Sequence, residues 1–141
     1  MAGAKGSAFW DDLAADLADP EFLRDFVVES VRIATIDRLV NELDEAREAA
    51  GLSKAELARA IRAEPASIRR LFAQGHSNPT LGTLAEVASA LGMKVTLTPL
   101  PAAERKKVTA PLLEGRTADP KALAEHLVAT RGGREFASAT R

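Results

Sequence analysis

Apolar residues recur every three to four positions along most of this chain, which is the spacing of one face of an α-helix. Four stretches show this pattern behind a residue that can start a helix: 8–18 after Ser7, 20–50 from Asp19-Pro20, 81–91 after Thr80, and 121–130 from Asp119-Pro120. The second stretch carries two apolar stripes, at 22–31 and 36–46. Because it exceeds the usual length of a globular helix, we expect a bend or break near Val28–Ala34.

The stretch from Gly51 to Gly75 predicts two shorter helices joined by a tight turn. Ser53, followed three residues later by Glu56, forms the pattern of a capping box at the start of the first helix. Pro65 suits the first turn of the second helix, where its missing N–H has no partner to lose. Gly75 suits the residue that follows the helix.

The second of these helices is basic on its exposed side. Ile68 and Leu71 form its apolar stripe, which leaves Arg69 and Arg70 pointing outward. Two short helices with a tight turn are the sequence form of a helix-turn-helix, whose second helix lies in the major groove of DNA. Arginine suits that position, since its guanidinium can pair with guanine or with phosphate.

The spacing of apolar residues changes after Gly92. Residues 94–98 alternate between polar and apolar side chains and end at Pro99, a pattern that predicts a short β-strand. A lone strand lacks a ladder partner, and the simplest partner is the same strand in a second copy. We therefore expect a homodimer held by Val95 and Leu97. Residues 101–116 are polar and contain proline, and they are interpreted as a linker.

Composition supports helices over sheet. The chain is 46% hydrophobic but holds one Trp, five Phe and no Tyr, whereas alanine is abundant. It has no cysteine, which excludes disulfides and thiolate metal sites. The N-terminus turns acidic where a signal peptide needs an apolar segment, and no apolar run is long enough for a membrane span. We expect a cytoplasmic protein without membrane contact.

Charge is distributed unevenly. Residues 1–50 carry 5 basic and 12 acidic groups, residues 51–76 carry 5 and 2, and residues 94–141 carry 9 and 5. A basic centre is compatible with binding of nucleic acid. The alternative is a set of ordinary solvated helix faces, and the acidic groups could instead meet a basic partner protein. Phe9 and Trp10 either pack on the core or anchor that partner.

These motifs resemble the lambda-repressor-like, XRE-type helix-turn-helix domain over about residues 36–98. The matching stretches are Gly51–Ala58, Ile68–Leu71, Asn78–Leu84 and Ala88–Gly92. Asp-Pro-Glu-Phe at 19–22 and the strand look most like antitoxins of HigA-type toxin–antitoxin modules. Together, the residue pattern and the resemblance predict an all-α bundle with an N-terminal helical arm (1–32), a DNA-binding domain (33–93), a dimerisation strand (94–100), and a linker, short helix and disordered tail (101–141).

The resemblance also assigns functional residues. Ala66, Ser67 and Arg69 would face bases, and Arg70 would face bases or phosphate. Phosphate contacts are expected from Ser53, Lys54, Gln74, His76 and Asn78. The expected DNA-binding residues are Ser53, Lys54, Pro65, Ala66, Ser67, Arg69, Arg70, Gln74, His76 and Asn78. Simpler roles remain open: Ser53 as a helix cap alone, and Asn78 as a turn former before Pro79.

Three positions depart from the family pattern. Arg62 stands where the turn usually has glycine, so we expect a strained or differently built turn. Glu64 replaces the usual Ser or Thr N-cap, which places a poorer cap and a negative charge near DNA. Phe72 replaces a frequent glutamate and is interpreted as a change in the core.

No catalytic constellation, cofactor motif or metal-ligand cluster is visible, so we expect neither an enzyme nor a cofactor. The implied function is a sequence-specific repressor that binds a palindromic operator as a homodimer, autoregulates its operon and neutralises a cognate toxin. Two alternatives stay open. One is a free-standing XRE-type regulator without a toxin. The other is a helical interaction protein that kept the fold and lost DNA binding.

Overall fold

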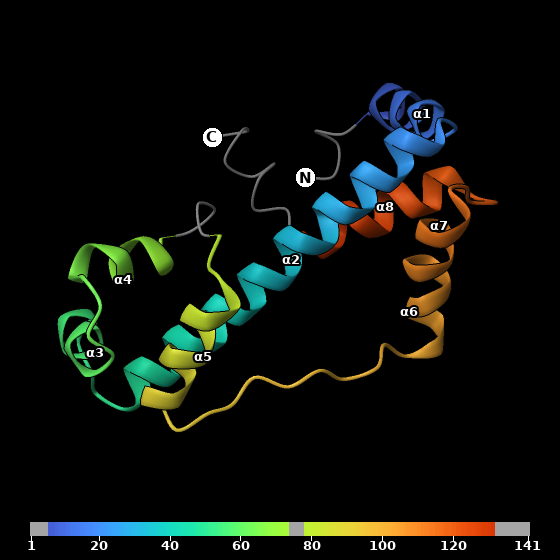
Figure 1. Cartoon of the computed structure of the whole chain (residues 1–141). Helices are drawn as coiled ribbons and strands as arrows, with labels where there is room; N and C mark the ends of the chain where they lie inside the picture. Colours follow the sequence, from blue (N-terminus) through green and yellow to red (C-terminus); the bar gives the residue numbers. More distant parts are fainter. Residues whose placement is uncertain (1–5, 74–77, 132–141) are drawn as a thin grey trace. The chain divides into compact units, whose positions relative to one another are not determined.

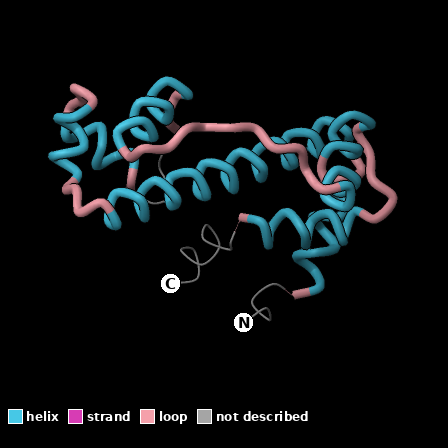
Figure 2. The backbone as a smooth tube through the Cα atoms, turned by 90° about the horizontal axis from the view of Figure 1, so that it is seen from below, coloured by secondary structure: helices cyan, strands magenta, loops and turns pink. Residues whose placement is uncertain are grey.

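The structure, a computed structural model, describes residues 6–73 and 78–131, and all regular secondary structure in these ranges is helical (Figures 1 and 2). The helices are α1 (Ser7–Asp16), α2 (Pro20–Ala49), α3 (Lys54–Ala60), α4 (Pro65–Leu71), α5 (Leu81–Ala90), α6 (Ala102–Lys107), α7 (Thr109–Glu114) and α8 (Pro120–Thr130). The predicted all-helical class with a helix-turn-helix is confirmed. Gln74 and His76, two expected DNA contacts, lie outside the described residues, as does Gly75.

The chain forms two compact units. The central unit is Thr35–Thr98, and the terminal unit combines Met1–Ala34 with Pro99–Arg141. The N-terminal arm and the C-terminal segment, which the sequence suggested as separate extensions, therefore belong to one unit. Helix α2 contributes its first part to the terminal unit and its last part to the central unit.

The core of the central unit is built from the apolar stripes of four helices. Its buried members come from α2, α3, α5 and the α4 segment: Val40, Leu43, Leu57, Ala58, Ile68, Leu71, Phe72, Leu84, Val87 and Ala88. Full burial of a Leu, Ile or Val side chain stabilises a fold by roughly 1.5–3 kcal/mol. Small Ala58 lies where α3 packs against α4 and α5, as its size suggests. Phe72 is 7% exposed, so its predicted place in the core is confirmed.

Most predicted helix starts are also found. The side chains of Ser53, Thr80 and Asp119 each accept a hydrogen bond from the backbone amide three residues later. The prediction for Ser7 is wrong. Gly6 has the extended conformation of an N-cap, and Ser7 is already the first helical residue, so its hydroxyl does not cap α1.

The core of the terminal unit joins α1, α2, α8 and residue 108. Its buried members are Leu17, Leu23, Val27, Val108, Leu123, Ala124 and Leu127, and Trp10 packs against them. Of the two alternatives for Trp10, packing on the core is therefore the one observed. Phe9 meets Trp10 edge to face, with ring centroids 5.0 Å apart.

Residues 101–116 were expected to be a linker, and this prediction is wrong, because they form α6 and α7. Val108 and Pro111 are buried, which anchors the two short helices. Arg24 on α2 donates from Nε to the carbonyl of Leu112 at 2.9 Å and from Nη2 to that of Leu113 at 3.1 Å. These bonds satisfy carbonyls at the C-terminal end of α7 that no intrahelical amide can reach.

Two further expectations differ from the structure. Helix α2 is continuous from Pro20 to Ala49, without the expected break near Val28–Ala34, because no proline or glycine interrupts its hydrogen bonds. Residues 94–98 do not form a β-strand, since no described segment of the chain pairs with them. Instead they run as an exposed loop (Figure 2). With α2 and α5 they line a groove.

Candidate DNA-binding surface

Helix α4 is held to the central core by two side chains. Ile68 is 1% exposed and Leu71 is 5% exposed, and this fixes which residues of the helix reach solvent. Arg69 and Arg70 are exposed, as the apolar pattern predicts. Arg70 donates from Nη2 to the hydroxyl of Ser67 at 3.3 Å, so two expected DNA-binding residues lie together on one exposed side.

The first turn of α4 holds two further expected contacts. Pro65 is the first helical residue and is exposed, and Ala66 is partly buried. Glu64 occupies the N-cap, but its side chain makes no capping hydrogen bond. The poor cap predicted for Glu64 is therefore what the structure shows.

Helix α3 begins with a complete capping box. The hydroxyl of Ser53 accepts from the amide of Glu56 at 3.0 Å, and the carboxylate of Glu56 accepts from the amide of Ser53 at 2.8 Å. The backbone hydrogen bond from Ser53 lowers the pKa of Glu56. The capping role of Ser53 is thus confirmed, whereas a phosphate contact by Ser53 or by its partly exposed neighbour Lys54 stays a prediction.

The turn between α3 and α4 has a left-handed residue that is not glycine. Arg62 has φ 58°, which makes it the one described non-glycine residue with a positive φ. Its amide donates to the carbonyl of Arg59 at 3.2 Å, and the amide of Ala63 donates to that of Ala58 at 2.8 Å. This pair of bonds defines a Schellman motif, whose C′ residue is left-handed. The strain expected at Arg62 is therefore present.

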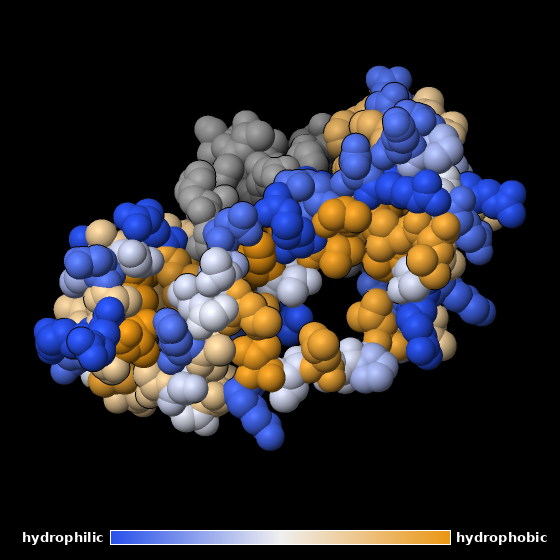
Figure 3. All heavy atoms as spheres, viewed as in Figure 1, coloured by the Kyte–Doolittle hydropathy of each residue, from blue (hydrophilic) through white to orange (hydrophobic). Residues whose placement is uncertain are grey.

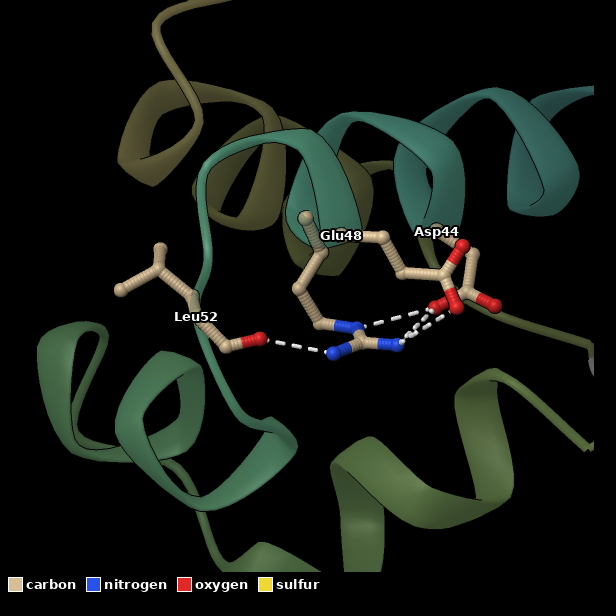
Figure 4. A network of polar contacts seen from close by, with 4 residues as sticks. Asp44, Glu48 and Leu52 are labelled. Atoms are coloured by element: carbon tan, nitrogen blue, oxygen red, sulfur yellow. Dashed lines mark hydrogen bonds and ion pairs between the residues drawn. The ribbon is translucent and has the colours of Figure 1, made fainter.

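An arginine that the sequence did not single out positions α3 and α4. Arg47, near the end of α2, has a side chain only 12% exposed. Figure 4 shows its polar contacts with Asp44, Glu48 and Leu52. Its guanidinium donates to Asp44 from Nε at 2.9 Å and to the carbonyl of Leu52 from Nη1 at 2.7 Å. Its Nη2 lies 3.8 Å from Glu48, and its Cζ lies 5.7 Å from the ring centroid of Phe72. One side chain thus ties α2 to the loop before α3 and to the residue that ends α4.

Over α3 and α4, Figure 3 shows hydrophilic side chains mixed with apolar ones on the face drawn there. Asn78 is exposed and lies two residues before the N-cap of α5, a position that suits the turn-forming role. The two expected dimerisation residues are also accessible: Val95 is 39% exposed and Leu97 is 98% exposed. The structure thus brings Ser67, Arg69 and Arg70 together on α4, with Pro65 and Ala66 in the first turn of the same helix. Ser53 and Lys54 lie at the start of α3, and Asn78 lies before α5.

The described part of the chain shows neither a metal-binding cluster nor a membrane-spanning helix. Residues 6–73 and 78–131 contain no group of three or more His, Asp or Glu side chains arranged to hold a metal ion. Among the same residues, no helix is long and apolar enough to cross a membrane.

Comparison with known proteins agrees with this geometry. Residues 43–97 match the family model described as Helix-turn-helix, and the matched range contains α3, α4 and α5. The match suggests a DNA-binding transcriptional regulator of the XRE type. No curated protein and no solved structure matches the chain significantly.

Proposed function

We propose that this chain is a sequence-specific transcriptional repressor, with α4 as the helix that enters the major groove. The observation that carries the proposal is the exposed pair Arg69 and Arg70 on a helix whose other side is fixed in the core. Such a helix can present arginines to guanine and phosphate without rearranging the fold. Ser67 and Ala66 are the neighbouring candidates for base contact, and Ser53, Lys54 and Asn78 are candidates for phosphate.

An electrophoretic mobility shift with DNA from upstream of the gene tests this role. The double variant Arg69→Ala/Arg70→Ala should lose most of its affinity, since one good bidentate arginine–base pair contributes about 1–3 kcal/mol of discrimination. The control Arg105→Ala/Lys106→Ala removes two exposed cations from α6 in the terminal unit. Equal binding by wild type and the α4 double variant at matched salt would refute the role of α4.

The proposal includes a homodimer that reads a palindromic operator, with half-sites about 10 bp apart or a multiple of that. Residues 94–98 support it, because they are exposed and have no pairing partner among the described residues. Leu97→Glu should weaken a dimer built there. Analytical ultracentrifugation decides the point: a 15.0 kDa monomer at tens of micromolar would contradict the dimer.

We further propose that the protein is the antitoxin of a toxin–antitoxin module, with the terminal unit as the surface that meets the toxin. Support comes from the chain itself, because a second folded unit with its own core accompanies the DNA-binding unit. An adjacent small gene whose product co-purifies with this chain supports the antitoxin. Without such a neighbour, the free-standing regulator is the better assignment, and unchanged mobility with every duplex supports the interaction protein.

A further inference from the structure

The same helix ending occurs three times in the central unit. Gly51 follows α2 and Gly92 follows α5, at φ 72° and 74°, whereas Arg62 follows α3 at φ 58°. In each case the next amide reaches back to the helix: Leu52 to the carbonyl of Arg47 at 3.2 Å, Met93 to that of Ala88 at 2.8 Å, and Ala63 to that of Ala58 at 2.8 Å. One motif thus uses glycine twice and arginine once.

Arginine is a costly choice for this position. A left-handed backbone brings Cβ close to the following carbonyl oxygen, which glycine avoids and which Asn tolerates better than most residues. The fold would therefore accept glycine at position 62 with less strain, as it does at Gly51 and Gly92. A strained residue that persists at such a turn is a reason to look for a function of its side chain.

The side chain of Arg62 has no structural role that would explain the strain. It is exposed, and within the described residues no ion pair or hydrogen bond of its guanidinium is seen. Glu64, two residues later, does not pair with it. Arg62 is thus a solvent-facing cation three residues before Pro65, the first residue of α4.

We propose that Arg62 contacts the phosphate backbone of duplex DNA beside the groove that α4 enters, an inference that rests on the proposed function. The guanidinium can donate two parallel hydrogen bonds to one phosphate, and it keeps its charge at every physiological pH. Arg62 also adds a positive charge close to Glu64, whose carboxylate would otherwise face an anionic polymer alone.

Three substitutions at position 62 distinguish the effect of the positive charge from the effect of the left-handed backbone. Arg62→Gly and Arg62→Asn fit the left-handed backbone and remove the charge, whereas Arg62→Lys keeps the charge and the strain. Binding is measured by fluorescence anisotropy over a series of NaCl concentrations. The probes are a duplex from upstream of the gene and an unrelated duplex of equal length. Thermal melts of each variant accompany the binding curves.

We expect Arg62→Gly to keep or gain thermal stability but to lose part of the salt dependence of DNA binding. The melting temperature of Arg62→Gly should equal or exceed that of wild type. Its slope of log K against log [NaCl] should become shallower by about 0.9 on both duplexes, the value for one phosphate. Arg62→Asn should show the same change of slope, and Arg62→Lys should keep the wild-type slope. The control Arg116→Gln removes a cation that is 85% exposed in the terminal unit and should leave the slope unchanged.

Each other outcome overturns the inference. An unchanged slope in Arg62→Gly and Arg62→Asn means that Arg62 is only a tolerated turn residue. A loss confined to the upstream duplex means that Arg62 reads a base rather than phosphate. An equal change in Arg116→Gln means that net charge alone is responsible. If wild type binds neither duplex, the proposed function fails together with the inference, whereas wild-type binding with unchanged variants refutes the inference alone.

Discussion

Replacing Arg47 with methionine should destabilise the central unit more than any other single loss of an ion pair there. Methionine keeps an apolar stem against Phe72 but removes every hydrogen bond of the guanidinium. The lost contacts are the bonds to Asp44 and to the carbonyl of Leu52, together with the cation–π contact to Phe72.

The contacts of Arg47 set the expected magnitude. A hydrogen bond to a charged group contributes about 1.5–3 kcal/mol, and a partly exposed cation–π contact contributes about 1 kcal/mol. The carboxylates that lose their partner can still be hydrated, because the side chain of Asp44 is 34% exposed and that of Glu48 is 69% exposed. Hydrogen bonds to water therefore replace part of the lost interaction energy. We therefore expect a cost of about 2 kcal/mol. At about 4 °C per kcal/mol for a chain of this size, the melting temperature should fall by about 8 °C.

Urea denaturation followed by circular dichroism measures this cost, and Arg38→Met is the matched control. Arg38 lies on the same helix and pairs with Glu42 at 3.3 Å, but both side chains are more than half exposed. Such a pair contributes about 0.3–0.5 kcal/mol. If the two variants differ by less than about 0.5 kcal/mol at equal m-values, the reasoning about Arg47 is wrong.

Two further predictions concern helix caps and the terminal unit. Ser53→Ala and Thr80→Ala should each cost about 1 kcal/mol at pH 7. Of these two caps, the one at Ser53 includes a titratable partner, because the carboxylate of Glu56 completes it and its pKa is lowered in the folded state. The stabilisation by Glu56 is therefore present above the unfolded pKa and is lost as pH falls through the folded pKa. Urea melts of Glu56→Gln should therefore approach wild type below about pH 4, and a constant difference would contradict this. Arg131→Met should cost about 1–3 kcal/mol in urea, because Arg131 donates from Nε to buried Ser30 at 3.0 Å; a cost below about 0.5 kcal/mol would show that the Ser30 hydroxyl finds another partner.

The sequence alone predicts those structural features that depend on residues close together in the chain. The capping box at Ser53, the caps at Thr80 and Asp119, and the buried stripe of α4 follow from spacing within one or two helical turns. These features place α3, α4 and α5, which carry the candidate surface. At Arg62 the resemblance left two alternatives, a strained turn or a differently built one, and the left-handed backbone of Arg62 corresponds to the strained turn.

The sequence failed where stability comes from distant contacts. Helices α6 and α7 have six residues each, too few to be stable alone, and α6 carries three consecutive cations without an apolar stripe. They exist because Val108 and Pro111 are buried and because Arg24 caps α7 across 88 residues of sequence. The structural role of Arg47 could not be predicted for a related reason, since its contact with Phe72 joins residues far apart in the sequence.

The apolar stripes of α2 explain why the helix is continuous although a break was expected. Its first apolar stripe includes Leu23 and Val27, which lie in the core of the terminal unit. Its second stripe includes Val40 and Leu43, which lie in the core of the central unit. The second stripe does not continue the first at a spacing of 3.6 residues, whereas the expected bend or break rested on the length of the helix alone. The usual length of a helix reflects burial against one core, so a helix that serves two cores is stabilised in both halves. Two apolar stripes out of register, with no proline or glycine between them, therefore indicate two cores on an uninterrupted helix.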